Sequence, residues 1–213
     1  ETLIEDYSMR GGKPVCYGAD SALPLHAYHD DFVGRTACAF LEDVSEENPW
    51  HYFVSFVGPH DPFDAPTEYA DRYRDDPMPD RIEDPLDHKP FYHKERSRRE
   101  WEGATREGLA ECMRQYSGMV TLIDDYVGRF VEILENRGIL DNTILIYCAD
   151  HGEMLGDHGF FRKAVYYESA VRVPLIIAGA GVEQIGQTDA LVELNDLTAT
   201  CQQVAGVAPR ADL

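Results

Sequence analysis

The sequence predicts an α/β fold, a three-layer α/β/α sandwich in which a mostly parallel sheet carries helices on its faces. Strand-like apolar runs alternate with helical periodicity along the 213 residues, and this alternation is typical of parallel strands joined by crossover helices. A hydrophobic content of 44% and twelve tyrosines indicate a folded core. A chain of this length suffices for one large domain.

The first predicted helix covers residues 29–44, where apolar side chains recur at helical spacing. The first predicted strand is residues 51–57, which are rich in aromatic and β-branched residues. A glycine- and proline-rich segment, residues 58–63, stops this strand abruptly.

A polar stretch with many prolines, residues 65–101, predicts a long excursion over the surface. Loops of that length in a compact domain are usually functional or partly disordered. Its aromatic residues Phe91, Tyr92 and Trp101 could stack on a sugar or aryl ring, or they could pin the loop to the surface. The sequence leaves both alternatives open.

The longest predicted helix spans residues 105–138. Its apolar residues recur at three- and four-residue steps, and Gly138 is a typical helix-ending residue. The apolar run 143–147 then predicts a buried strand, after which a glycine-rich loop begins.

The last part of the chain continues the alternation. Residues 173–177 predict a strand with Pro174 near its start, where a missing N–H is tolerated. Residues 190–194 predict a further short strand. Asn195 is expected to cap a final helix that runs to Ala205.

Composition excludes several classes of protein. A net charge of −20 argues against binding nucleic acid through phosphate contacts. No apolar run approaches the roughly 20 residues that span a bilayer. Five cysteines without a CxxC pair disfavour a disulfide framework or a zinc knuckle. The chain starts without a methionine or a signal-peptide pattern, so we expect a piece of a longer protein, and the cytoplasm and the periplasm or exterior both remain open as compartments.

The candidate metal site is Asp150-His151-Gly152, directly after the 143–147 strand. Ligands bind beyond the carboxyl ends of strands in open α/β sheets. A carboxylate and an imidazole are both ligands for divalent cations, and glycine lets the backbone bend around an ion. We therefore predict that Asp150 and His151 ligate a metal.

Two further candidates follow the same strands. His60 comes after the 51–57 run, and Lys163 lies thirteen residues beyond Asp150. If the strands are neighbours, these groups converge on one crevice that suits an anionic, oxygen-rich substrate. A cation and Lys163 would stabilise charge on its oxygens, and His60 would bind the substrate or help protonate a leaving group.

Each of these residues also has a structural interpretation. A lone histidine such as His60 is more often a loop hydrogen-bonder, Asp150 alone could cap a turn, and Lys163 alone would be a solvated cation. Asp157 and His158 are expected only to fasten the glycine loop through local hydrogen bonds.

In combination, several segments resemble the sulfatases of the alkaline phosphatase superfamily. The segments that carry the resemblance are residues 58–63, 116–128, 150–159, 162–163, 167–177 and 196–200, with Ala205 and Gly206. Their order and number make the resemblance specific, and it covers most of residues 27–209.

The resemblance implies an alkaline-phosphatase-like fold and hydrolysis of sulfate esters with a divalent metal, calcium first and manganese as the alternative. It implies that Asp150 and His151 are the late pair of metal ligands. Lys163 matches the lysine that contacts the sulfate, and His60 matches the histidine near the sulfate and its leaving group. The implied partner is a small-molecule or sugar sulfate ester, with no nucleic acid and no membrane span.

The sequence departs from that family in one respect. No Cys or Ser stands in the C/S-x-P-x-R motif that supplies the family's formylglycine nucleophile. Residues 1–213 are therefore expected to be part of the large catalytic domain, incomplete at the N-terminus, without the nucleophile region and without the C-terminal subdomain. Such a piece would hold half a metal site, be inactive alone and tend to self-associate.

Two alternatives stay open. His151 stands where sulfatases commonly have Asn, and imidazole suits a transition metal such as manganese. That substitution keeps a phosphonate monoester or phosphodiester hydrolase of the same superfamily as an alternative. A non-catalytic remnant domain is the other.

Overall fold

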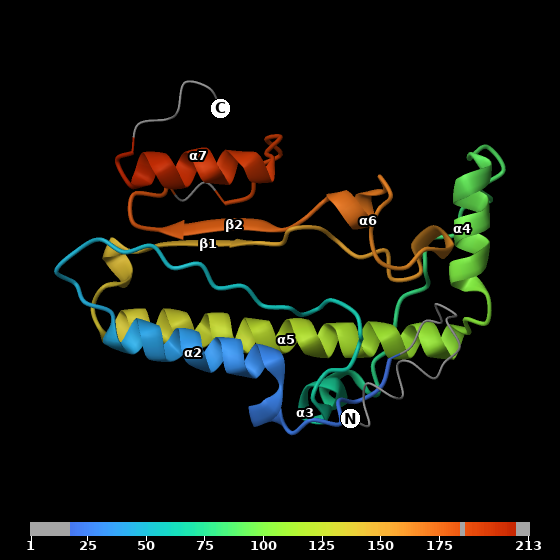
Figure 1. Cartoon of the computed structure of the whole chain (residues 1–213), viewed down its shortest axis with the longest axis horizontal. Coiled ribbons are helices and arrows are strands. Elements are labelled where there is room, and N and C mark those ends of the chain that lie inside the picture. The colour runs from blue at the N-terminus through green and yellow to red at the C-terminus, as the bar shows by residue number, and fades with distance from the viewer. Residues whose placement is uncertain (1–17, 184–185, 208–213) are drawn as a thin grey trace.

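The structure is a computed structural model that describes residues 18–183 and 186–207. Its two strands, β1 (Ile144–Cys148) and β2 (Leu175–Gly179), lie between helices on both sides (Figure 1). On one side are α5 (Arg106–Asn136) and α2 (His29–Asp43), and on the other is α7 (Leu194–Val204). The remaining helical segments, with η for 3-10 helix, are η1 (Leu25–Ala27), α3 (Thr67–Ala70), η2 (Asp71–Tyr73), α4 (Phe91–Trp101), η3 (Leu140–Asn142), η4 (Asp157–Gly159) and α6 (Glu168–Val171).

The long helix α5 confirms the predicted helix over residues 105–138. Thr105 caps it, because its hydroxyl oxygen accepts the Gly108 N–H at 3.0 Å. Gly138 follows its last turn with φ of 70°, a left-handed conformation that favours glycine. The described helices include none that combines the length and the apolar character of a membrane span.

The main core lies between α2 and α5. Tyr28, Leu41, Met119, Leu122 and Tyr126 are among its buried residues. The predicted helix over residues 29–44 is confirmed by α2. A buried polar contact joins the two helices, since the Tyr126 hydroxyl donates to Asp31 at 2.5 Å.

Residues 51–57 are extended but do not form the predicted strand. Alternate side chains pack on the core, and Phe53 between them is 78% exposed. The predicted periodicity is therefore present, yet no other described segment pairs with this one in a ladder. Hydrogen bonds to a neighbour define a strand, so an alternating pattern alone does not make one.

Asp30 anchors the end of this extended segment to α2. Its fully buried carboxylate accepts the N–H groups of Val57 at 2.8 Å and Gly58 at 2.9 Å. The position of His60, two residues further on, thus depends on α2, which begins at His29.

The observed strands pair antiparallel, with Ile146 opposite Ile177. The sequence predicts the α/β class and both strands, but a mostly parallel sheet. The difference arises because residues 149–174 connect β1 to β2 as a wide loop instead of a crossover helix.

The predicted strand over residues 190–194 is wrong, and the final helix begins at Leu194. Glu193, not Asn195, is the capping residue. Its side chain and that of Asp196 each accept the other residue's backbone N–H, which forms a capping box.

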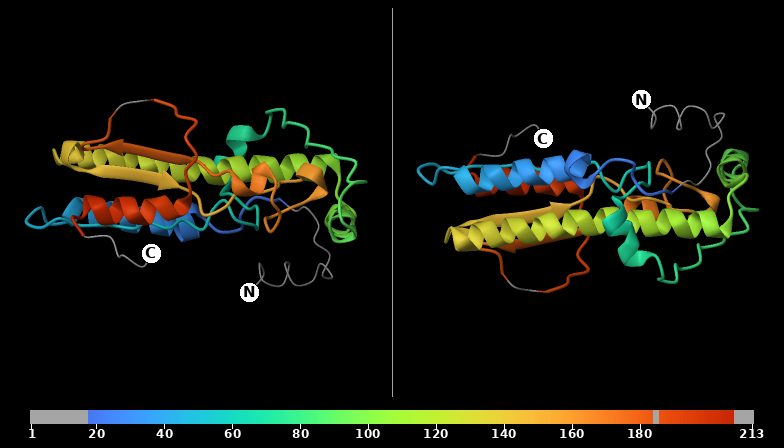
Figure 2. Two further views of the ribbon diagram at one scale, coloured as in Figure 1. Left: turned by 90° about the horizontal axis from the view of Figure 1, so that it is seen from above. Right: turned by 90° about the horizontal axis from the view of Figure 1, so that it is seen from below.

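The 65–101 excursion contains α3, η2 and α4 and is not a featureless loop. Figures 1 and 2 place α4 at one end of α5, beside the loop that contains η4. Trp101 stacks on Phe161 with ring centroids 6.1 Å apart, so this aromatic residue pins the excursion to the domain. Phe91 and Tyr92 remain exposed.

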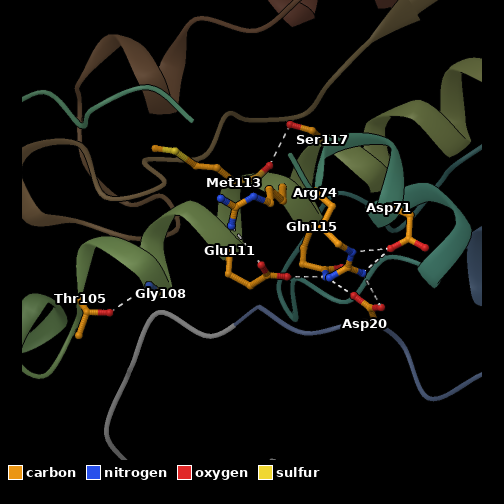
Figure 3. A network of polar contacts seen from close by, with 10 residues as sticks. Asp20, Asp71, Arg74, Thr105, Gly108, Glu111, Met113, Gln115 and Ser117 are labelled. Atoms are coloured by element: carbon orange, nitrogen blue, oxygen red, sulfur yellow. Dashed lines mark hydrogen bonds and ion pairs between the residues drawn. The ribbon is translucent and has the colours of Figure 1, made fainter. Parts of the chain in front are cut away.

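A polar network ties the start of the described chain to α5 (Figure 3). The amide nitrogen of Gln115, a fully buried residue, donates to Asp20 at 2.8 Å and to Glu111 at 2.9 Å. Arg74 adds an ion pair to Asp20 at 3.1 Å.

Candidate functional site

The structure brings His60 and Lys163 into contact. The Lys163 ammonium nitrogen lies 2.5 Å from Nε2 of His60. The His151 ring lies beside them, with its centroid 6.3 Å from that of His60. The convergence expected from the ends of the two segments is therefore present, and the catalytic roles of these residues stay predictions.

The hydrogen bonds of His60 identify its tautomer. Its Nδ1 lies 2.7 Å from the carbonyl oxygen of Asp61, which can only accept. In the neutral ring Nδ1 therefore carries the hydrogen and Nε2 accepts from Lys163. An ammonium has three donors, so Lys163 keeps two for a substrate.

Asp150 and His151 stand at the end of β1. Nδ1 of His151 lies 2.9 Å from the Gly152 carbonyl oxygen, which again places the hydrogen on Nδ1 in the neutral ring. Its Nε2 is 3.6 Å from the Asp150 carboxylate, whose side chain is 87% exposed. An imidazole nitrogen and a carboxylate oxygen are thus available together at the surface.

This pair fits part of a metal's coordination sphere. The described part of the chain contains no group of three or more His, Cys, Asp or Glu side chains that could hold a metal ion. Divalent cations in proteins take at least four ligands. Asp150 and His151 could supply two of them, so the remaining ligands would come from elsewhere.

An open pocket of about 510 Å³ lies over these residues. Asp150, His151 and Lys163 line one part of it. Apolar groups form the rest of the wall, from Ala164, Val165, Tyr166, Ala170 and Val171. Polar groups beside an apolar wall suit an anion that is esterified to an organic group.

The loop that carries the site is tightly folded. Gly152 donates its N–H to the Ala170 carbonyl oxygen at 2.8 Å, and a Cβ at Gly152 would overlap the Ser169 carbonyl oxygen. Among the residues that the structure describes, every non-glycine residue with positive φ lies in this loop: Leu155, His158, Arg162 and Ala164. Such conformations are uncommon and persist only where surrounding contacts impose them.

Glu153 supplies one of these contacts, although its role was not predicted from the sequence. Its carboxylate accepts the N–H of Leu155 at 3.1 Å and that of Arg162 at 2.5 Å, which joins the two ends of the turn. Burial raises the pKa of Glu153, and the negative charge of Asp61 acts in the same direction. The two N–H donors and Lys163 oppose that rise. The signal that could have identified it is an acidic residue in the middle of a glycine-rich loop.

Asp157 and His158 fasten the loop, as predicted, but through distant partners. The Asp157 carboxylate accepts the Ile82 N–H at 2.7 Å and the Ser169 hydroxyl at 2.8 Å. The His158 ring stacks on Tyr167 at 4.0 Å.

Comparison with known proteins places this geometry in context. A family model described as Sulfatase matches residues 2–207. An arylsulfatase of Clostridium perfringens is 33% identical over 187 residues, which cover 84% of this chain and 38% of the relative. A choline-sulfatase of Rhizobium meliloti is 32% identical over 84% of this chain and 37% of its own length.

Solved structures share the fold. A protein in complex with its substrate D-glucosamine-2-N,6-O-disulfate superposes with a TM-score of 0.77 at 22% identity, over 87% of this chain and 50% of the other. A phosphonate monoester hydrolase from Silicibacter pomeroyi superposes with a TM-score of 0.76 at 23% identity, over 96% of this chain and 45% of the other. At this identity the likeness concerns the fold, and it confirms the predicted α/β class.

Proposed function

This chain belongs to the sulfatase family, and on that premise we propose that it supplies the anion-binding part of a site that hydrolyses sulfate esters. The observation that carries the proposal is the approach of Lys163 to His60 beside His151. The chain spans 38% and 37% of the length of the two curated relatives described above. We therefore assign the activity to the complete enzyme, meaning a protein in which this chain accompanies the nucleophile-bearing region.

In this proposal Lys163 stabilises the sulfate group. Two of its ammonium donors remain after the contact to His60, and they can reach non-bridging sulfate oxygens. Negative charge builds on these oxygens and on the leaving-group oxygen as the S–O bond breaks. A fixed ammonium lowers the energy of that charge most where water is displaced.

His60 acts on the leaving group. Its Nδ1 is fixed by the Asp61 carbonyl oxygen, so the Nε2 edge faces Lys163 and the substrate. Because Nε2 of the neutral ring holds no proton, His60 would act as an acid only as the imidazolium, once the Lys163 ammonium has turned to the sulfate. Its Nε2–H can then pass to the departing oxygen, which makes the alcohol a better leaving group. Lys163 and His60 would thus divide charge stabilisation and proton transfer between them.

Asp150 and His151 would hold a divalent metal, calcium in the first instance and manganese as the alternative. The ion, when bound, would supply Lewis-acid polarisation of the sulfate oxygens. A carboxylate suits either ion, and the imidazole favours manganese. The nucleophile, a formylglycine in this proposal, would come from the region outside residues 1–213.

The substrate class is a small-molecule or sugar sulfate ester. The apolar wall formed by residues 164–166 and 170–171 gives the organic part of such an ester a surface to contact. Tyr166, which is 97% exposed, offers a ring face to a sugar or aryl group.

The test is a comparison of substrates with the complete enzyme. We expect kcat/KM for an aryl sulfate to exceed that for phenyl phosphonate. The reverse order would replace the proposal with a phosphonate monoester hydrolase, the second candidate, which His151 as a metal ligand favours. Hydrolysis of neither substrate by an enzyme that carries an intact nucleophile motif would favour a non-catalytic domain.

A further inference from the structure

We propose that Arg96 and Glu100 of α4 are positioning residues that set the backbone around Lys163. This inference rests on the proposed function, because it concerns how Lys163 is held for a substrate. Both side chains belong to the 65–101 excursion, which the sequence indicates only as a surface segment.

Arg96 binds three carbonyl groups of residues 161–164, the part of the 149–174 loop that contains Lys163. Its guanidinium donates to the carbonyl oxygens of Lys163 at 2.8 Å, Ala164 at 3.0 Å and Phe161 at 3.3 Å. The Arg96 side chain is only 13% exposed, and its bonds to Phe161 and Lys163 are partly shielded from water. One side chain therefore holds the carbonyl of Lys163 itself and those on both sides of it.

Glu100 acts together with Arg96, and we call this pair the α4 clamp. One of its carboxylate oxygens accepts from Nε of Arg96 at 2.6 Å, and the other accepts the N–H of Phe161 at 2.8 Å. Its side chain is 16% exposed. Arg96 and Glu100 together thus provide hydrogen-bond partners for three carbonyl groups and one N–H group of the same loop.

The loop needs such partners because its backbone is unusual. Arg162 and Ala164, on either side of Lys163, have φ of 66° and 71°. A left-handed backbone conformation is disfavoured at non-glycine residues. Backbone carbonyl groups that point into the protein, away from water, need hydrogen-bond partners there. The clamp provides these partners, and Lys163 points toward His60 from the backbone that results.

Arginine is the residue that this geometry requires. Its planar fork presents five N–H donors in fixed directions, whereas a lysine ammonium is a point charge on a flexible stem. The exposed arginines of the same helix differ, since Arg98 and Arg99 pair with Glu95 within α4. Arg99 is therefore a matched control.

The first experiment is Arg96→Lys in the complete enzyme, with Arg99→Lys as the control. We expect R96K to lower kcat for an aryl sulfate by about 10-fold to 100-fold, the effect of misplacing a catalytic group by roughly 1 Å. R99K is expected to leave kcat unchanged. A wild-type kcat in R96K would overturn the proposal.

A double-mutant cycle separates positioning from a general loss of structure. If Arg96 acts through Lys163, R96K should change kcat/KM by less than about twofold in the K163A background. An equal loss in both backgrounds would show a structural role only. Glu100→Gln keeps an oxygen for the Phe161 N–H and provides the same cycle if R96K does not fold.

A measurement without activity distinguishes failure of this inference from failure of the proposed function. We expect the Phe161 amide to exchange its hydrogen faster in R96K than in wild type, and at the wild-type rate in R99K. Unchanged exchange in R96K would overturn the clamp even in an active enzyme. Faster exchange in R96K, together with an unchanged kcat/KM in K163A, would support the clamp and contradict the role of Lys163.

Discussion

The ammonium of Lys163 lies 2.5 Å from Nε2 of His60, a residue 103 positions earlier in the chain. The contact joins the end of one extended segment to the loop after β1. Lys163 also lines the pocket beside Asp150 and His151, so its contact with His60 orients an ammonium next to the place that we propose for a bound anion.

Lys163→Ala in the complete enzyme is expected to lower kcat/KM for an aryl sulfate by about 10²-fold or more, because a donor to the developing negative charge is lost. Steady-state kinetics measures the change. Lys94→Ala is the control, since that ammonium binds the Asp87 carbonyl oxygen within the excursion. Equal kcat/KM in K163A and wild type would remove Lys163 from the site.

Asp150→Ala is expected to abolish binding of the divalent metal to the complete enzyme, because it removes one of the two ligands that we propose among the described residues. Isothermal titration with calcium and with manganese measures affinity. Asp141→Ala, in η3 before β1, changes an exposed carboxylate at the other end of the same strand and should leave affinity intact. Undiminished affinity in D150A contradicts the ligand role.

Asp64 is expected to make the protein less stable as pH rises. Burial, together with the nearby Asp30, raises the pKa of Asp64 from 3.8 to about 6. The unfolded chain releases this proton first, so the contribution of Asp64 to the free energy of unfolding falls between those two pH values. One of its carboxylate oxygens is buried without a hydrogen-bond partner.

Asp64→Asn removes that titration. Relative to wild type, D64N should gain stability as pH rises from 4 toward 6, by on the order of 1 kcal/mol for this half-buried group. Urea unfolding across this pH range measures the difference. Asp189→Asn, at an exposed position, should show none. A parallel pH dependence in D64N and wild type would refute the assignment.

Gln115→Leu is expected to lower the free energy of unfolding by about 1–2 kcal/mol, because Asp20 and Glu111 lose a shared donor while the side-chain volume is nearly kept. Chemical denaturation measures the loss. Gln203→Leu on α7 makes the same change at an exposed position and serves as the control. If both variants unfold at the same denaturant concentration, the network in Figure 3 contributes nothing to stability.

Sequence patterns predicted the elements whose own residues determine them. The helix α5 buries a continuous apolar stripe and has its cap and its terminating glycine in sequence. By contrast, α4 is dominated by charged residues, and it is held by contacts to a loop more than sixty positions away. Residues 51–57 show the same limit of sequence-based prediction, because an alternating pattern does not indicate which segment, if any, pairs with them.

The site divides in the same way. The placement of His60, Asp150 and His151 was predictable because each closely follows a strand-like run, and Lys163 lies in the loop after the second run; their roles stay predictions. The placement of Arg96 was not predictable, because it binds backbone carbonyl groups, and every residue type carries the same carbonyl. Only the fold determines which carbonyl groups face an arginine.

The antiparallel register of β1 and β2 has a consequence for how the site can change. Both ends of the 149–174 loop leave the same two-stranded ribbon, with Cys148 opposite Leu175. The loop therefore starts and ends at neighbouring points of one ribbon, and we expect that its length and sequence can change without shifting the two strands. Exchanging the 149–174 loop between homologues would transfer Asp150 and Lys163 together, whereas Arg96 and Glu100 of α4 would have to be exchanged separately.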